Sequence, residues 1–186
     1  MYGQVWNGAE LSRSLAVSQP TIRRYLDTLT STFLVRILRP WSENLGKRQV
    51  KAPKVFLADS GILHALLGLG GREALLGHPK VGASWEGFAQ AQVARRLRAW
   101  PEECYFWAAH TGAELDFLVV SNGKRYGFEV KRTSVPAVTR SMRIALEDLK
   151  LKELVVIHAG KDSFPMTERI RAVALSRVLE DLRPLR

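Results

Sequence analysis

The sequence predicts an α/β protein in which a small winged helix precedes a mixed sheet flanked by helices. Three observations support this prediction. Residues 8–29 carry two short apolar patterns at helical spacing, and two β-rich runs after them enclose a basic loop. From residue 84 onward, helical and strand-like patterns follow one another, with an Asn-Gly hairpin among them. We therefore expect a winged-helix domain at residues 1–70, a glycine-rich linker at 71–82 and a second domain at 83–186.

The first element is a predicted helix-turn-helix. Its first helical pattern ends at Leu15 and its second begins near Ile22, with only Ala-Val-Ser as a tight turn before the second helix. Ser18 is placed to cap the second helix, and Pro20 falls in its first turn, where a missing N–H costs little.

A wing is predicted next, because the β-rich runs FLVRILRPW and VFLA flank the polar and basic segment SENLGKRQVKAPK. In a winged helix of this kind, the second helix presents side chains to a DNA major groove and the loop contacts phosphates. The candidate DNA-binding residues are Thr21, Arg23, Arg24, Lys47, Arg48 and Lys51. In the alternative, Arg23 and Arg24 form an ordinary solvated helix face and the winged helix docks on a protein.

The first domain ends with a predicted helix at residues 60–67, and a mixed sheet flanked by helices is the economical assembly of the elements beyond it. The expected elements are a helix at 84–100, a strand at 104–109, a hairpin at 112–133, a helix at 138–150, a strand at 153–159, and a strand with a helix at 169–182. The first of these helices is expected to bury Trp85, Phe88 or Ala89, Val93 and Leu97.

The hairpin mixes charged and apolar residues around its turn, Asn122-Gly123. A symmetric register sets Phe117 opposite Phe128 and Asp116 opposite Glu129. One face is then apolar and suited to a core. It holds Leu115, Phe117, Val119, Tyr126, Phe128 and Val130. The other face holds Glu114, Asp116, Leu118, Val120, Glu129 and Lys131.

Two opposed carboxylates repel each other, because their Cβ atoms lie only about 4.5–5.5 Å apart. Lys131 offsets part of this repulsion, and Mg²⁺ can offset the rest, since it accepts oxygen ligands from carboxylates and water. We expect the helix at 84–100 to half-cover this face, with Glu86 and Gln90 on a flank over the carboxylates. In the alternative, the charges form the solvated face of an edge hairpin, with Lys131 paired to Glu114.

The pattern of a glutamate on a helix, an aspartate on one strand and Glu-x-Lys on the next resembles the PD-(D/E)XK restriction-endonuclease-like superfamily. More narrowly, WEGF, FWAAHTGAELDFLV and GFEVKRT resemble the domain of unknown function that follows the ATPase module of many bacterial and archaeal AAA-type ATPases. SQPTIRRYLDTLTSTFLV and KVFLADSGIL resemble the winged-helix segment of the same proteins. The resemblance covers nearly the whole chain, which lacks the ATPase module itself.

The resemblance implies a restriction-endonuclease-like second domain with a metal-dependent nuclease site, and an AAA-type ATPase module as a partner in cis. Asp116, Glu129 and the carbonyl of Val130 would bind Mg²⁺ or Mn²⁺. Glu86 would complete the site, and Lys131 would orient the attacking water or stabilise charge on the phosphate. The superfamily also contains members that only bind. The alternative to a Mg-dependent deoxyribonuclease is therefore a non-catalytic DNA- or protein-docking regulatory module of the ATPase.

Composition limits the other classes of function. A net charge of +10 on 186 residues favours an anionic partner, of which DNA or another nucleic acid is the commonest. Cys104 is the only cysteine and the chain shows no secretory leader, so we expect a cytoplasmic location. The longest apolar run is too short to insert in a membrane. The G-x-x-x-x-G pattern at residues 77–82 lacks the following lysine, so we expect no ATP site in this chain.

Overall fold

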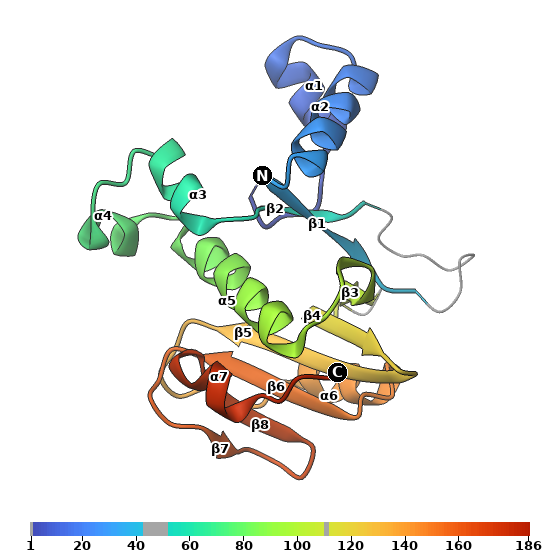
Figure 1. The fold of residues 1–186 in the computed structure, drawn as a ribbon, viewed down its shortest axis with the longest axis vertical. Helices are drawn as coiled ribbons and strands as arrows, with labels where there is room; N and C mark the ends of the chain where they lie inside the picture. The colour runs from blue at the N-terminus through green and yellow to red at the C-terminus, as the bar shows by residue number, and fades with distance from the viewer. Residues whose placement is uncertain (1, 43–51, 110–111) are drawn as a thin grey trace. The chain divides into compact units, whose positions relative to one another are not determined.

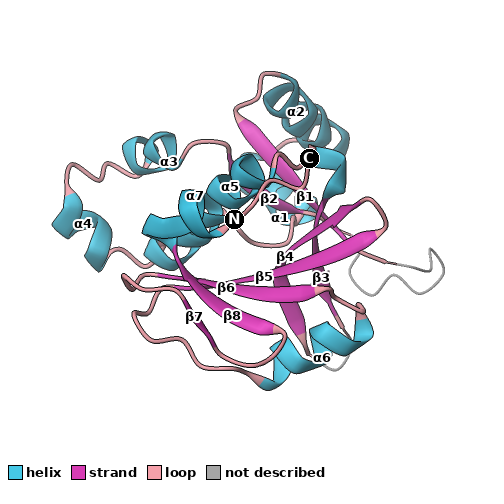
Figure 2. Ribbon diagram, turned by 60° about the horizontal axis from the view of Figure 1, so that its bottom comes forward, coloured by secondary structure: helices cyan, strands magenta, loops and turns pink. Residues whose placement is uncertain are grey.

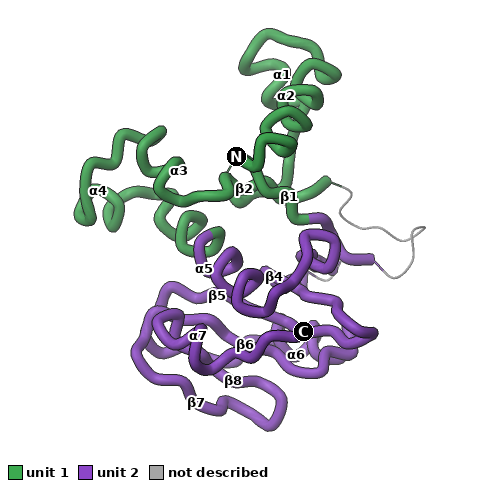
Figure 3. Tube along the Cα trace, viewed as in Figure 1, with its two compact units in different colours: residues 1–38, 52–87 green, residues 39–51, 88–186 purple. Residues whose placement is uncertain are grey.

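The computed structural model describes residues 2–42, 52–109 and 112–186. The chain divides into two compact units, which are described separately (Figure 3). Unit 1 comprises residues 1–38 and 52–87, and unit 2 comprises residues 39–51 and 88–186. The elements of unit 1 are α1 (Gly8–Leu15), α2 (Gln19–Ser31), most of β1 (Val35–Pro40), β2 (Lys54–Leu57), α3 (Ser60–Leu66), α4 (Arg72–Gly77) and the start of α5 (Val81–Leu97).

Unit 1 contains the helix-turn-helix and the antiparallel strand pair that the sequence predicts. Ala16 ends α1 in the left-handed conformation, and Ser18 caps α2 by accepting a hydrogen bond from the backbone N–H of Thr21. In α2, Ile22 and Leu26 are buried. Strands β1 and β2 pair in antiparallel register from Val35–Leu57 to Leu38–Lys54. The wing loop with Lys47, Arg48 and Lys51 lies outside the described residues.

The segment predicted as a linker, residues 71–82, contains helix α4 and the first residues of α5. Helix α5 begins at Val81, three residues before the predicted start at residue 84. Residues 81–87 of this helix belong to unit 1 and residues 88–97 to unit 2. In unit 2 the helix buries Ala89, Val93 and Leu97, whereas Phe88 is 42% exposed. Of the two alternatives for the buried position, Ala89 is therefore correct.

Unit 2 is a mixed sheet flanked by helices (Figure 1). After α5 its elements are the short 3-10 helix η2 (Pro101–Glu103), β3 (Cys104–Ala108), β4 (Glu114–Ser121), β5 (Lys124–Lys131), α6 (Arg140–Asp148), β6 (Glu153–His158), β7 (Phe164–Pro165), β8 (Ile170–Ala174), the 3-10 helix η3 (Leu175–Arg177) and α7 (Val178–Asp181). Its strands are ordered β3-β4-β5-β6-β8-β7, and the last two residues of β1 pair beside β3.

The pairing of the strands makes this sheet mixed. Strands β5, β6 and β8 run parallel, and the chain crosses from β5 to β6 through α6. Strands β3, β4 and β5 are joined by antiparallel pairing, β3 to β4 and β4 to β5. This combination of helices with a mixed sheet confirms the predicted α/β class. Among the described residues, no helix has the length and apolar character needed to cross a bilayer.

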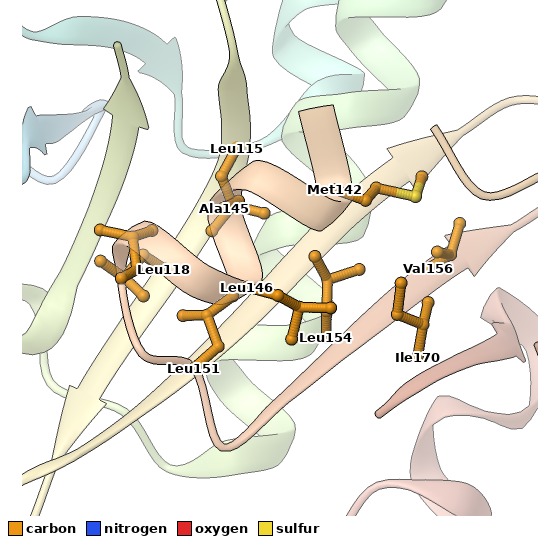
Figure 4. Packing of buried hydrophobic residues seen from close by; sticks show 10 residues of the cluster. Leu115, Leu118, Met142, Ala145, Leu146, Leu151, Leu154, Val156 and Ile170 are labelled. Carbon is orange, nitrogen blue, oxygen red and sulfur yellow. The ribbon is translucent and has the colours of Figure 1, made fainter. Parts of the chain in front are cut away.

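Helix α6 covers one face of the sheet of unit 2, and α7 lies on the other (Figure 2). The packing under α6 is apolar and almost fully buried, with Met142 and Ala145 of the helix at 0% exposure (Figure 4). The cluster consists of Leu115, Leu118, Met142, Ala145, Leu146, Leu149, Leu151, Leu154, Val156 and Ile170. Gly127 fits under this cluster because it has no side chain: a Cβ there would lie 2.5 Å from Leu151 Cδ1.

The turn and inner register of the hairpin are as predicted. Asn122 and Gly123 both have positive φ, at 51° and 70°, as a type I′ turn requires. Phe117 pairs with Phe128, and Ser121 pairs with Lys124.

The prediction fails at the start of β4. Tyr105 of β3 pairs with Leu118 of β4, but Trp107 pairs with Leu115, so two residues of β4 lie opposite one of β3. This β-bulge reverses the alternation of side chains. Leu115 therefore packs with Leu118 under α6, and its predicted place on the face of Phe117 is wrong. The expectation that the helix at 84–100 covers the face of Leu118 is also wrong, because α6 does so.

Candidate functional site

The bulge brings Asp116 to a point where β4 and β5 part. The regular pairing of these strands ends at Phe117–Phe128, and beyond it Asp116 Oδ2 accepts a hydrogen bond of 2.8 Å from the backbone N–H of Val130. In a continued ladder, this N–H would bond to a carbonyl of β4. The aspartate side chain has taken the place of that carbonyl, which fixes its carboxylate against β5.

Two side chains from helices hold the backbone around Asp116. Gln90 of α5, which is fully buried, donates from Nε2 to the carbonyl oxygen of Asp116 at 3.2 Å. Ser141 of α6 accepts from the N–H of Glu114 at 2.7 Å and donates to its carbonyl oxygen at 3.0 Å. The bulged segment thus has side-chain partners where regular strand pairing is interrupted.

Glu129 and Lys131 lie on the same face of β5, two residues apart. Lys131 Nζ is 2.7 Å from Glu129 Oε1. Glu129 is 3% exposed, and within the part of the chain that the structure describes its second oxygen, Oε2, is buried without a hydrogen-bond partner. An unpartnered buried carboxylate oxygen is costly. It marks a position where a cation or a proton would relieve the carboxylate.

The surroundings raise the pKa values of both Glu129 and Lys131. Burial, together with the negative charge of Asp116, raises the pKa of Glu129 to about 7, and the neighbouring Lys131 opposes this only in part. Burial lowers the pKa of Lys131, but the charge and hydrogen bond of Glu129 outweigh it, with help from Asp116 and Glu114, and leave that pKa above its ordinary value. Asp116, Glu129 and Lys131 therefore form one electrostatically linked group, as the sequence predicts.

Val130 offers a backbone oxygen to the same place. The N–H and C=O of one strand residue point to the same side, and the N–H of Val130 points to Asp116. Its carbonyl therefore points toward the β4 side as well. The donor set is two carboxylates and one carbonyl.

This donor set fits Mg²⁺ or Mn²⁺, which take a few oxygen ligands from the protein and complete their shell with water and phosphate. The described residues contain no group of three or more His, Cys, Asp or Glu side chains that could hold a metal ion.

Of the remaining predicted residues, those that the structure describes belong to unit 1. Glu86 lies on the first part of α5, where its Oε1 is 3.5 Å from Lys54 Nζ. Arg23 and Arg24 are exposed on α2. Thr21 is partly buried, and its hydroxyl lies 2.9 Å from that of Ser18, so it takes part in the cap of α2.

Sequence reasoning placed Gln90 on the correct helix but did not foresee that it binds the backbone of Asp116. It missed Ser141 entirely. A serine in the first turn of a helix usually indicates a cap, and its spacing from Glu114 carries no signal. Both contacts follow from the bulge in β4, and the bulge has no sequence signature here.

Comparison with known proteins adds two domain matches. A model described as a domain of unknown function, DUF4143, matches residues 81–178, and another, DUF8612, matches residues 1–73. Two uncharacterised mycobacterial proteins, one from Mycobacterium bovis and one from Mycobacterium tuberculosis, are each 49% identical over 178 residues. The match covers 96% of this chain and 40% of each relative. No solved structure matches the chain.

Proposed function

This chain belongs to the DUF4143 family, and from that premise we propose that it is the DNA-binding, metal-dependent nuclease-like region of an AAA-type ATPase. The observation that carries the proposal is the linked group of Asp116, Glu129 and Lys131, with one buried carboxylate oxygen that lacks a partner among the described residues. An ordinary solvated hairpin face would leave these carboxylates in water. Here Glu129 is 3% exposed, which favours a built site over that alternative.

The proposed reaction is hydrolysis of a phosphodiester. A water oxygen bonds to phosphorus as the ester P–O bond breaks, and the leaving oxygen takes up a proton. When bound, Mg²⁺ or Mn²⁺ would supply charge neutralisation and a more acidic water. Asp116, Glu129 and the carbonyl of Val130 are the residues of unit 2 that would hold it.

Lys131 has the charge and reach to act on the phosphate. Its Nζ is held by Glu129, and its side chain is 39% exposed, so it can donate outward while it stays anchored. An ammonium group in that position stabilises the negative charge that develops on the phosphate oxygens, or orients the attacking water.

The link to an ATPase rests on the resemblance and on length. The chain spans about 40% of the length of the curated relatives, so proteins of this kind have room for an ATPase module in cis. A DNA-binding winged helix and a nuclease-like domain would then be the parts through which such a motor engages DNA.

The wild-type chain is expected to bind Mg²⁺ or Mn²⁺ at or below millimolar concentration and to cleave DNA in its presence. Asp116→Asn should remove metal binding yet keep the fold, because the amide oxygen can still accept the hydrogen bond from Val130 while the charge is lost. Calorimetric titration and cleavage assays on single-stranded, duplex and branched DNA test both points. Absence of metal binding by the wild type would refute the nuclease proposal. Metal binding without cleavage of any substrate would instead favour the non-catalytic docking module.

For unit 1, we expect Arg23→Ala combined with Arg24→Ala to weaken DNA binding. The slope of log K against log salt should become shallower by about one for each phosphate that the helix no longer neutralises. Binding titrations at several salt concentrations measure it. Arg13→Ala combined with Arg72→Ala is the control, because it removes the same charge from exposed positions outside α2. An unchanged slope in the α2 variant would mean that the helix faces a protein.

A further inference from the structure

We infer that Gln90 and Ser141 are positioning residues that hold the carboxylate of Asp116 in place from two different helices. The inference rests on the proposed function for its consequence, which is metal binding. The geometric claim can be tested without metal. Neither residue carries a charge or belongs to the proposed donor set.

Gln90 acts on the bulge itself. The extra residue in a β-bulge leaves backbone groups outside the ladder, and Asp116 lies in the stretch of β4 where the register shifts. Gln90 Nε2 bonds to that carbonyl at 3.2 Å, and the whole side chain is at 0% exposure. A buried amide in this position fixes the peptide plane that follows Asp116, and with it the direction of the carboxylate.

Ser141 acts two residues earlier. The carbonyl of Ala113 bonds to Ala109 on the β3 side, so the N–H and C=O of Glu114 point to the opposite side. There the ladder with β5 has already ended, and Ser141 Oγ bonds to both groups, at 2.7 Å and 3.0 Å. One hydroxyl thus replaces a strand partner for Glu114.

Ser141 thus binds the backbone of Glu114 and Gln90 binds the carbonyl of Asp116, while the N–H of Val130 binds the Asp116 carboxylate. Without them, the segment from Glu114 to Asp116 would keep its pairing with β3 and the bond from Val130 to Asp116, but it would lose the two side chains that fix its backbone. The carboxylate would then lose its fixed distance to Glu129. Side chains that orient metal ligands in this way typically change metal affinity about 10- to 100-fold when they are removed.

The N–H of Val130 reports directly on the position of Asp116, because it donates to Oδ2. We expect Gln90→Met, which keeps the length but removes the donor, to speed hydrogen exchange of the Val130 amide about tenfold in the metal-free full chain. Amides of the central strand β6, such as that of Val155, should change much less. Gln92→Met, two residues along the same helix, is the matched control and should leave Val130 unchanged.

Ser141 supplies a second test in case Gln90→Met does not fold. Ser141→Ala should also expose the Val130 amide, and Ser141→Thr, which keeps the hydroxyl, should restore its protection. In calorimetric titrations with Mn²⁺, Gln90→Met and Ser141→Ala should each weaken binding at least about tenfold, with Ser141→Thr close to wild type.

The outcomes separate this inference from the proposed function. If the Val130 amide exchanges at the wild-type rate in both Gln90→Met and Ser141→Ala, the positioning inference is overturned. An equal loss of protection throughout unit 2 would also overturn it, because it indicates general destabilisation only. If the wild type binds no Mn²⁺, the nuclease proposal fails, and selective exposure of Val130 still establishes that these residues position Asp116.

Discussion

Lys131→Ala is expected to lower the rate of DNA cleavage by at least about 100-fold while metal affinity stays close to that of the wild type. Removing one preorganised donor that stabilises charge in a transition state typically costs about 10²- to 10³-fold in rate. Lys131 is suited to that role because its ammonium is anchored at 2.7 Å on Glu129 and is still 39% exposed. Single-turnover cleavage with saturating enzyme and Mg²⁺ measures the effect on the chemical step.

The pH of this experiment matters. Lys131 lowers the pKa of Glu129, so its removal favours the protonated carboxyl, which is a poor metal ligand. At pH 7 this would weaken metal binding and confuse the two roles. A pH of about 8.5 together with saturating Mg²⁺ favours the ionised form of Glu129 in both proteins, so the loss of rate reports on Lys131 itself.

Two further variants serve as controls for Lys131→Ala. Lys124→Ala removes the same charge from the exposed first residue of β5 and should leave cleavage within about twofold of wild type. Lys131→Arg keeps a cation and should retain part of the rate. If Lys131→Ala cleaves as fast as Lys124→Ala, then Lys131 only balances Glu129, and the proposed mechanism loses its second functional group.

Local signals in the sequence were sufficient for most of the fold. The Asn122-Gly123 turn alone fixes the inner register of the hairpin, because a type I′ turn matches the twist of the two flanking strands. Ser18 and the short turn before it likewise predict where α2 begins. In both cases a few residues have one strongly favoured conformation.

The sequence could not predict the bulge, because no glycine or proline marks it. Symmetric alternation placed Leu115 with Phe117, whereas the extra residue in β4 turns Leu115 toward α6. Helix α4 was missed for a related reason. The glycines around Arg72–Gly77 indicate a linker, although Glu-Ala-Leu-Leu between them favours a helix.

The structure brings together three of the predicted site residues, Asp116, Glu129 and Lys131, whereas Glu86 pairs with Lys54 in unit 1. Asp116, Glu129 and Lys131 share the hairpin in any symmetric register, so their proximity follows from sequence. The bond from Val130 to Asp116 and the burial of Glu129 depend on how β4 leaves β5 and on how the helices cover the sheet. Those are properties of packing between elements distant in the chain, which local patterns do not encode.

Because Glu129 is buried, we expect the stability of the fold to depend strongly on pH. Its pKa is about 7 in the metal-free fold, against an ordinary value of 4.5 that applies to the unfolded chain. Between these values the folded state binds more protons than the unfolded state, so the contribution of Glu129 is fully present below pH 4.5 and is lost as pH rises through 7. One pKa unit corresponds to about 1.4 kcal/mol, so the free energy of unfolding falls by about 3 kcal/mol as Glu129 ionises.

The Glu129→Gln variant isolates this contribution, since glutamine keeps the shape of the protonated acid and never ionises. In urea unfolding with a chelator present, wild type and variant should have similar free energies of unfolding at about pH 4.5. The variant should then be more stable by about 3 kcal/mol at about pH 8.5. Comparing the two proteins at the same pH cancels the contributions of the other titrating groups to the free energy of unfolding.

Glu168→Gln, at an exposed position, is the control and should shift stability by less than about 0.5 kcal/mol at either pH. If Glu129→Gln gains nothing at the higher pH, water or a neighbouring group already satisfies the buried carboxylate, and the case for a cation at this position is lost with it.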